Sequence, residues 1–480
     1  MKTIKIAYTL LVAAGVAFSA CSDDDNSGFP PKPEQDLEAA PKVVSPQPAD
    51  GENAADMAQT ITVVYNKEIH ITPVTTISVN GDYIDQGIVV EGNTLTIPYQ
   101  TMPNKRYTVT ISSPSVRDEE YNFSPTYTFS FMTKGINVLD PSMFQLDKAP
   151  VNPNANAQAK ALYKVLLDNF GYRVISGAVA EGCHDTRMAN VMKGMSGKLP
   201  VINCFDFMEH YQCAPVNPNG WSKANYQDVS VDTKWASNGG IVSYQWHWEV
   251  PISEADVENF NNYAFYCSGS GKTTDFSPER ALTEGTWENK VITRDLDAIA
   301  SYLLGLQEAG IPVLWRPLHE ASGIGLASAS RPWFWWGTDG AEVYKKLWIH
   351  MFDTFKAKGV NNLVWVWTSC GNDADWYPGD EYVDVIGVDY YENNPENYHL
   401  SLVENMGKLL TFSNRKMLAL SECGALPSVD AMVNGGDMWS FAVPWNGQYT
   451  TDPSINSPEF FREFLNSDFV LTQDEMTPIK

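Results

Sequence analysis

Two glutamates, Glu320 and Glu422, each follow a run of mainly apolar residues that is typical of a buried strand. Burying a carboxylate there costs free energy, so two such residues in one chain favour chemistry over packing. Cleavage of a glycosidic bond needs this pair, because one group protonates the departing oxygen while the other attacks the anomeric carbon. We therefore predict that Glu320 is the general acid/base and that Glu422 is the nucleophile.

These glutamates need a scaffold that brings them together. From residue 137 onward, apolar strands alternate with amphipathic helices, which predicts a (β/α)8 TIM barrel over residues 137–480. Catalytic residues of such barrels lie at the C-terminal ends of the strands, and the two glutamates follow the fourth and the seventh predicted strands. The predicted strands are Arg173–Ala178, Leu199–Phe205, Gly240–Trp246, Pro312–Pro317, Leu363–Thr368, Asp384–Val388, Met417–Ser421 and Trp439–Pro444. The helices between them include Ala157–Phe170, Arg294–Ala309, Ala341–Lys358 and Leu400–Phe412.

A different pattern covers residues 41–135. Short runs of β-branched and aromatic residues alternate with polar ones and are separated by turn signals such as Gly92-Asn93, which predicts an antiparallel Ig-like β-sandwich. It carries no catalytic constellation, so a spacer is favoured over a carbohydrate-binding module. The clearest predicted strands are Thr60–Tyr65, Thr94–Ile97, Tyr107–Ile111 and Tyr127–Phe131.

The N-terminal segment predicts export. Two lysines precede the apolar run Ile6–Phe18, which has the length of a signal-peptide core and is too short to span a bilayer. The sequence that ends at Cys21 resembles a bacterial lipobox, and the acidic stretch after it resembles the surface-export signal of Bacteroidetes lipoproteins. We therefore expect a signal peptide at 1–20, lipidation of Cys21, a flexible tether at 21–40 and display on the outer membrane of a Gram-negative cell. Plain secretion, with Cys21 as an incidental thiol, is the alternative.

Charge and motif content argue against several other classes. The 33 basic and 58 acidic residues give a net charge of −25, which disfavours nucleic-acid binding. Ser270–Thr273 lacks the first glycine of a nucleotide-binding loop, and His319-Glu320 lacks the second histidine of a zinc motif. We expect no nucleotide, metal or other cofactor. Six cysteines besides Cys21 permit disulfides or buried free thiols, and the sequence does not decide between them.

Several segments resemble glycoside hydrolase family 26. The strongest are Ile311–Glu320 and Trp333–Gly337, and the resemblance extends over residues 137–480. It implies a retaining barrel, in a family dominated by β-mannanases, with the acid/base after strand four and the nucleophile after strand seven. Both positions agree with the glutamates identified above. Further matching segments are Trp246–Trp248, Leu363–Trp367, Asp375–Asp380 and Gly387–Tyr391.

The resemblance also implies a substrate-binding set. His247 and His319 would hydrogen-bond the sugar or the nucleophile, and Tyr391 would orient Glu422. Trp333 would stack under the sugar on the leaving-group side, and Asp389 completes the set. Trp445, at a strand end, is a further candidate for substrate binding, although packing explains it as well. A satisfied core histidine is the alternative for His247, and a buried helix start is the alternative for the Trp333 cluster.

One segment departs from the family pattern. Ala321–Pro332, between Glu320 and Trp333, is longer than the expected short link, and this length would carry Trp333 out of stacking reach. Asp206 and Trp376 are further residues at strand ends, although packing explains each of them as well.

The expected activity is that of an endo-β-1,4-mannanase that cleaves mannan or galactomannan by double displacement, with the two carboxyl groups about 5 to 5.5 Å apart. Hydrolysis of β-1,3-xylan or mixed-linkage glucan is the alternative within the family. A non-catalytic, glycan-binding surface lipoprotein is the alternative outside it, but such a binder has no reason to keep both glutamates.

Overall fold

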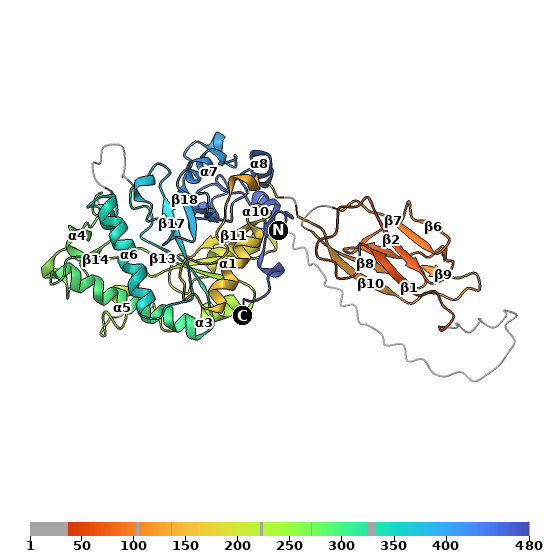
Figure 1. Cartoon of the computed structure of the whole chain (residues 1–480), viewed down its shortest axis with the longest axis horizontal. Coiled ribbons are helices and arrows are strands. Elements are labelled where there is room, and N and C mark those ends of the chain that lie inside the picture. Colours follow the sequence, from red (N-terminus) through yellow and green to blue (C-terminus); the bar gives the residue numbers. More distant parts are fainter. Residues whose placement is uncertain are drawn as a thin grey trace, which may run out of the picture. The chain divides into compact units, whose positions relative to one another are not determined.

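The structure of the protein is a computed structural model, and it describes residues 37–101, 105–135, 137–220, 224–269, 271–323 and 332–479. A β-sandwich forms the N-terminal part, and a barrel of strands and helices forms the rest (Figure 1). The expected signal peptide and Cys21 lie outside the described residues. Within these ranges, no helix combines the length and the apolar character that crossing a membrane requires.

The sandwich consists of two four-stranded sheets in the described part of the chain, ordered β1-β2-β7-β6 and β10-β8-β4-β5. Its interior follows the period-two pattern of the sequence: Ile61, Val63 and Tyr65 of β2 are buried, while the residues between them are partly exposed. The predicted Ig-like sandwich is therefore confirmed. Its strands are β1 (Val43–Gln47), β2 (Thr60–Tyr65), β3 (His70–Ile71), β4 (Ile77–Val79), β5 (Asp82–Tyr83), β6 (Val89–Glu91), β7 (Thr94–Pro98), β8 (Arg106–Ile111), β9 (Val116–Arg117) and β10 (Tyr127–Met132).

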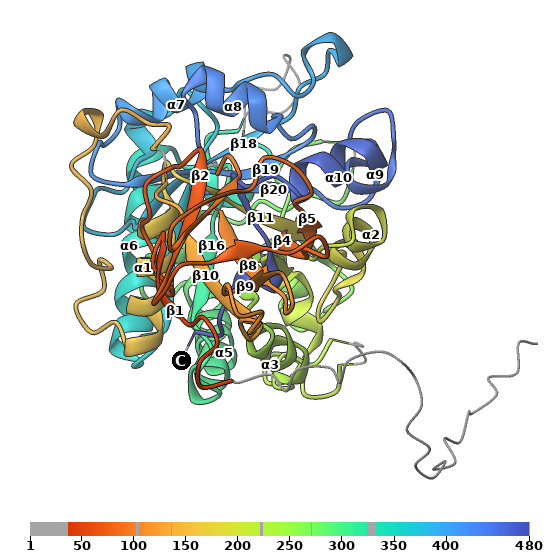
Figure 2. The same ribbon diagram turned by 90° about the vertical axis from the view of Figure 1, so that its right-hand side faces the viewer.

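The barrel is closed by parallel pairing in the order β12-β13-β16-β17-β18-β19-β20-β11, with β11 returning to β12. Figure 2 shows β18, β19, β20 and β11 following one another around it. These eight strands, all within the described residues, confirm the predicted (β/α)8 barrel. They are β11 (Val174–Val179), β12 (Ile202–Asp206), β13 (Ile241–Trp246), β16 (Val313–Pro317), β17 (Leu363–Ser369), β18 (Val385–Tyr390), β19 (Met417–Cys423) and β20 (Phe441–Pro444). Three short strands lie outside this ring, namely β14 (Val250–Pro251), β15 (Tyr263–Ala264) and β21 (Val470–Leu471).

Helices connect the barrel strands. The longest, α5, begins at Trp287, although the sequence predicted a start at Arg294. Thr286 caps the helix by accepting a hydrogen bond from the backbone N–H of Asn289. The helix therefore begins about two turns earlier in the chain than predicted. The helices are α1 (Ala157–Asn169), α2 (Arg187–Ser196), α3 (Ser230–Ser237), α4 (Pro278–Ala281), α5 (Trp287–Glu308), α6 (Ala341–Ala357), α7 (Val403–Leu410), α8 (Val429–Gly435), α9 (Gln448–Thr451) and α10 (Pro458–Leu465).

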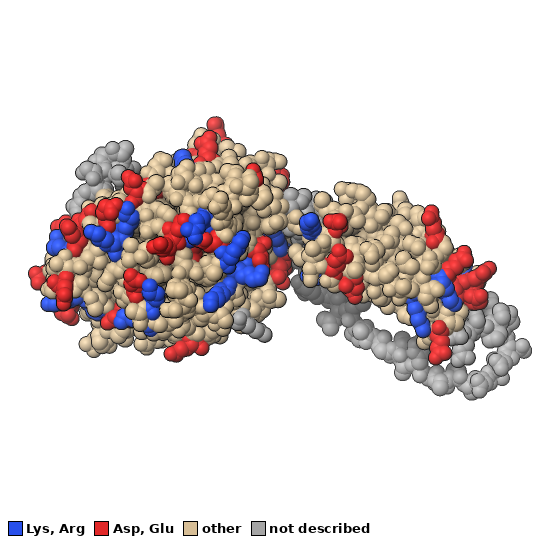
Figure 3. Space-filling model, viewed as in Figure 1, with Lys and Arg blue, Asp and Glu red and all other residues tan. Residues whose placement is uncertain are grey.

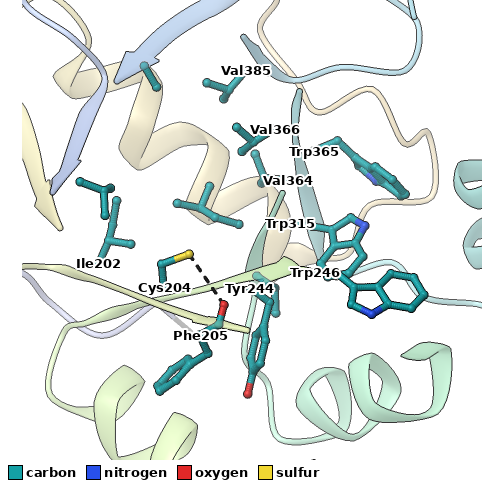
Figure 4. Close-up of a cluster of buried hydrophobic side chains, with 14 of the residues drawn as sticks. Ile202, Cys204, Phe205, Tyr244, Trp246, Trp315, Val364, Trp365, Val366 and Val385 are labelled. Carbon is teal, nitrogen blue, oxygen red and sulfur yellow. Dashed lines mark hydrogen bonds between the residues drawn. The ribbon is translucent and has the colours of Figure 1, made fainter. Parts of the chain in front are cut away.

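Side chains on the two faces of the barrel strands differ in size. In β17, Val364 and Val366 point to one side of the strand, and Trp365 points to the other (Figure 4). The Trp365 ring packs on Phe352 of α6, with 4.9 Å between ring centroids. Compact residues therefore fill the barrel, and large aromatic residues bind the helices to its outside. This packing gives the strand ends a rigid base.

The barrel surface in view carries charges of both signs. Lysine and arginine side chains lie among aspartates and glutamates over α5 and α6, and they do not form a continuous basic surface on this face (Figure 3). This arrangement accords with the negative net charge of the chain.

The six cysteines within the described residues are free thiols. Cys423 at the end of β19 is buried, whereas Cys370 after β17 is exposed. The disulfides that the sequence left open are therefore not formed among these six residues.

Candidate active site

Glu320 and Glu422 meet at the C-terminal mouth of the barrel. Glu422 lies within β19, and Glu320 follows β16 in a tight turn in which Leu318 and Glu320 have φ angles of 49° and 53°. Non-glycine residues seldom adopt this left-handed region, and such backbone strain clusters at functional sites. One carboxylate oxygen from each of Glu320, Asp389 and Glu422 lies within 4.8 Å of the other two.

This spacing decides between two types of glycosidic cleavage. Enzymes that retain the anomeric configuration hold their carboxyl groups about 5 to 5.5 Å apart, whereas inverting enzymes need about 6.5 to 9.5 Å to admit a water molecule. One oxygen of Glu320 lies within 4.8 Å of one oxygen of Glu422, which fits the shorter spacing. The geometry fits direct attack by one carboxylate on the sugar.

Arg316 supplies the positive charge at the centre of this cluster. Its guanidinium is buried and donates hydrogen bonds to Glu422 Oε1 and, over 3.0 Å, to Asp389 Oδ2. Tyr391 donates its hydroxyl hydrogen to Glu422 Oε2 over 2.7 Å. Ser421 donates to Asp389 Oδ1, also over 2.7 Å. Both oxygens of Glu422 thus accept hydrogen bonds, an arrangement that stabilises its ionised form.

The surroundings separate the pKa values of the two glutamates. Burial raises the pKa of Glu320 well above its usual range, and the neighbouring Asp389 and Glu422 raise it further. Burial also raises the pKa of Glu422, but Arg316 and Tyr391 oppose the effect and leave it at about 7. Glu320 therefore keeps its proton after Glu422 has lost one. This is the division that an acid and a nucleophile require.

Two histidines border the cluster. His247 Nδ1 lies 2.5 Å from Asp206 Oδ2, and His247 Nε2 lies 3.3 Å from His319 Nε2. Burial disfavours a charged His247, but Asp206 overcomes this and raises its pKa. Burial, Arg316 and His247 together lower the pKa of His319 well below its usual value. The ring of His319 therefore stays neutral, and its hydrogen-bonding neighbour is His247.

Aromatic residues line the mouth of the barrel. The half-buried indole of Trp333 lies against Gly323, where an added Cβ would come within 2.2 Å of the ring. The ring of Trp445 lies 6.0 Å from that of His247. Most of the long segment expected to displace Trp333 lies outside the described residues, although Trp333 itself is placed beside the residues that follow Glu320.

Four residues of the site were not predicted from the sequence: Arg316, Ser421, Gln245 and Tyr266. The Gln245 side chain accepts a hydrogen bond from Arg316, and the pKa of Tyr266 is raised by burial and by the nearby Glu320. Arg316 carried a usable signal, because a charged residue within the apolar strand Val313–Pro317 must have a buried partner. Tyr266 is 43% exposed and stacks on Phe334 with the ring centroids 5.5 Å apart. Its place in the site was not predictable from the sequence, because Tyr266 lies in a loop, where no strand pattern shows which way a side chain points.

Comparison with known proteins follows the same division of the chain. Residues 151–475 match the model of glycosyl hydrolase family 26, and residues 38–133 match a bacterial Ig-like domain. Among curated relatives, a mannan endo-1,4-β-mannosidase of Thermothelomyces thermophilus is 33% identical over 336 residues, covering 69% of this chain and 64% of that protein. Mannan endo-1,4-β-mannosidase A of Piromyces sp is 32% identical, covering 69% of this chain and 51% of that protein. The chain thus spans between half and two thirds of the length of these relatives.

Solved structures show the same likeness. The family 26 domain of an endo-β-mannanase/endo-β-glucanase from Prevotella bryantii is 37% identical, with a TM-score of 0.60, and covers 68% of this chain and 99% of that one. A β-mannanase from a symbiotic protist of the termite Reticulitermes speratus, solved with a gluco-manno-oligosaccharide, is 36% identical, with a TM-score of 0.61, covering 70% of this chain and 99% of that one. The chain therefore belongs to glycosyl hydrolase family 26 and carries a bacterial Ig-like domain ahead of its catalytic barrel.

Proposed function

We propose that the protein is a retaining endo-β-1,4-mannanase in which Glu320 is the acid/base and Glu422 is the nucleophile. The observation that carries this proposal is the pair of carboxylates, half-buried Glu320 and buried Glu422, with oxygens within 4.8 Å of each other. Glu320 has a strongly raised pKa, and Glu422 is hydrogen-bonded by Arg316 and Tyr391. The substrate is inferred from the relatives, which are named mannan endo-1,4-β-mannosidases.

The reaction has two displacement steps. The Glu422 carboxylate attacks the anomeric carbon while Glu320 protonates the departing oxygen, so the glycosidic bond breaks and a glycosyl ester on Glu422 forms. Glu320, now ionised, removes a proton from water, and the water oxygen attacks the same carbon and releases Glu422. Two inversions return the original configuration.

Arg316 and Tyr391 hold Glu422 in place for this attack. Each donates to a different oxygen of the carboxylate, which fixes its orientation relative to the sugar. Asp389 accepts a hydrogen bond from the arginine and is itself held by a hydrogen bond from Ser421. We propose that the pair of His319 and His247, with Asp206 behind His247, hydrogen-bonds the sugar, and that Trp333 and Trp445 stack on pyranose rings.

Product analysis tests the proposed function. Purified protein would be incubated separately with linear mannan, galactomannan, xylan and mixed-linkage glucan. Short manno-oligosaccharides from the mannans alone are the expected result. Cleavage of xylan or mixed-linkage glucan alone would contradict the substrate class, and no cleavage of any of the four would contradict the enzymatic function.

A pH profile tests the assignment of the two roles. The active form has Glu422 ionised and Glu320 protonated, so kcat/KM should rise through the pKa of Glu422, about 7, and fall at the higher pKa of Glu320. The measurement is the initial rate on mannohexaose from pH 5 to pH 10. In Glu320→Gln the slower remaining activity should lose its alkaline fall, since the amide does not titrate. An alkaline fall that persists unchanged in this variant would exclude Glu320 as the acid.

We also propose that the protein is anchored to the outer membrane through a lipid on Cys21 and is exposed at the cell surface. This proposal rests on the sequence around Cys21. In a Bacteroidetes host, metabolic labelling with an alkyne fatty acid should tag the protein, and Cys21→Ala should abolish the label. Protease added to intact cells should digest the unaltered protein. An unlabelled protein would contradict the anchor, and a labelled but protected one would contradict surface exposure.

A further inference from the structure

Two neighbouring hollows open beside the proposed acid/base. The first, of about 620 Å³, is bordered by Ser322, Trp333, Cys370 and Trp376, among others. The second, of about 370 Å³, is bordered by Trp376, Lys408 and Phe412, among others. Both volumes lie in the range of about 300 to 1,000 Å³ that is typical of ligand pockets. The two hollows share Asn372, Asp373 and Trp376, so they lie next to each other, and we refer to the two together as the path.

The first hollow lies close to the turn that carries Glu320. Ser322 and Gly323, which border the first hollow, lie two and three residues after Glu320 in the chain, and the Gly323 N–H donates to the Glu320 carbonyl over 2.9 Å. Cys370 borders the same hollow, and Glu320 is among the groups that raise the pKa of its thiol. Neither glutamate borders the hollows itself, but the residues just after Glu320 do, whereas Arg316 and Tyr391, which hold Glu422, do not. The path therefore leaves the site on the side of the acid, where the leaving group departs.

The floor of the path is held rigidly by Asp373. This buried carboxylate accepts hydrogen bonds from Ser322, over 2.5 Å, and from Ser369 and the Cys370 N–H, so it joins the segments that follow β16 and β17. Its carbonyl accepts the N–H of Trp376 over 2.8 Å. The Trp376 ring also packs on Tyr344 of α6, with 5.6 Å between centroids. A shape preset in this way needs little ordering when a ligand binds.

The side chains along the path suit a chain of pyranose rings. Trp333 and Trp376 are half-buried and offer aromatic surface to the apolar face of a sugar, and the exposed Asn372, Asp375 and Lys408 offer donors and acceptors to its hydroxyls. This combination of partly exposed aromatic surface and polar rim is typical of a carbohydrate groove. It would suit neither a purely apolar ligand nor a metal ion.

We propose that this path is an extended leaving-group site, in which Trp376 binds a mannose unit beyond the one that rests on Trp333. The inference rests on the proposed function and adds to it a residue that decides where a long chain is cut. A glycan held on both sides of the catalytic pair is cleaved internally. Trp376 therefore favours binding modes that place several sugars on the side of Glu320.

The test compares cleavage positions within one oligosaccharide. Mannohexaose marked with ¹⁸O at its reducing end would be digested by the unaltered full-length protein and by Trp376→Ala, and mass spectrometry would give the frequency of cleavage at each bond. Because these frequencies are ratios within one reaction, they do not depend on the fraction of folded protein. The control is Trp287→Ala, which removes a half-buried tryptophan that packs on Phe276 and borders neither hollow.

The expected result is that Trp376→Ala reduces cleavage with three sugars on the leaving side, relative to cleavage with one, by about fivefold or more. Trp287→Ala should leave this ratio unchanged. An unchanged ratio in Trp376→Ala would overturn the inference while leaving the proposed function intact. If the unaltered protein does not cleave mannohexaose, the proposed function fails. In that case, calorimetry would measure the affinity of Glu422→Ala and of Glu422→Ala/Trp376→Ala for mannohexaose. Equal affinities would overturn the inference, and a lower affinity of the double variant would support it.

Discussion

Glu422→Ala is expected to lower kcat on mannan by about 10⁴-fold or more while the protein stays folded and still binds oligosaccharide. Glu422 is the group placed to attack the anomeric carbon, and no other described carboxylate has both Arg316 and Tyr391 as hydrogen-bond donors. Folding should survive, because Arg316 keeps Asp389 as a buried partner and the repulsion between Asp389 and Glu422 is removed. The measurements are turnover of mannohexaose and its binding by calorimetry.

Chemical rescue distinguishes the nucleophile from the acid. Azide can enter the space left in Glu422→Ala and attack the anomeric carbon from the face of the missing carboxylate, which yields the α-glycosyl azide. In the matched variant Glu320→Ala, azide attacks the glycosyl ester on Glu422 from the opposite face and yields the β-glycosyl azide. If Glu422→Ala gave the β-glycosyl azide and Glu320→Ala the α-glycosyl azide, the two roles would be exchanged. Near-normal turnover by Glu422→Ala would exclude Glu422 as the nucleophile.

Arg316→Met is expected to reduce the free energy of unfolding by about 3 to 5 kcal/mol at neutral pH, the usual consequence of removing one partner of a buried ion pair. The substitution keeps the length of the side chain but leaves Asp389, Glu422 and Glu320 close together without a cation. The pKa of Glu422, already raised by burial, must then rise further, because Arg316 is the largest influence that lowers it. The acid limb of kcat/KM should therefore move to higher pH.

The sign of the stability effect follows from proton linkage. Carboxyl groups whose pKa is higher in the folded protein than in the unfolded chain favour folding while they are protonated, and this contribution is lost as the pH rises through the folded pKa. The stability deficit of Arg316→Met should therefore grow as the pH rises above about 7, the pKa of Glu422 in the unaltered protein, as measured by urea unfolding. The control, Arg415→Met, removes an exposed arginine that pairs with Asp147. It should show neither the large loss of unfolding free energy nor the shift of the kcat/KM profile to higher pH. An Arg316→Met protein with unchanged stability and pH profile would contradict the proposed role of this arginine.

The fold was predictable from the sequence because its strongest signals are local. All eight barrel strands appear within a few residues of the predicted ranges, since apolar runs of strand length alternate with amphipathic stretches. The start of α5 was misplaced because its first turns, Trp287–Thr293, are set by the Thr286 cap and carry a weaker apolar pattern. Helix boundaries depend on single capping residues, which the periodic spacing of apolar residues does not reveal.

The site was predictable where a residue's position on a strand determines its place. Glu320 and Glu422 follow from the rule that barrel sites gather at strand ends. The same rule does not predict which side chains hydrogen-bond each other within the site. His319 faces His247, and Asp389 faces Arg316, because the turn with positive φ at Leu318 and Glu320 and the irregular pairing of β18 with β19 set the side-chain directions. Such local backbone irregularities leave no periodic signal in the sequence.

The most direct test of the account is the anomeric configuration of the first product. Proton NMR would follow the digestion of mannohexaose by the unaltered protein, before mutarotation mixes the anomers. The carboxylate spacing within 4.8 Å predicts that the new reducing end appears first as the β-anomer and converts only later to the α-anomer. An α-anomer formed first would mean single displacement by water, and would contradict Glu422 as a nucleophile.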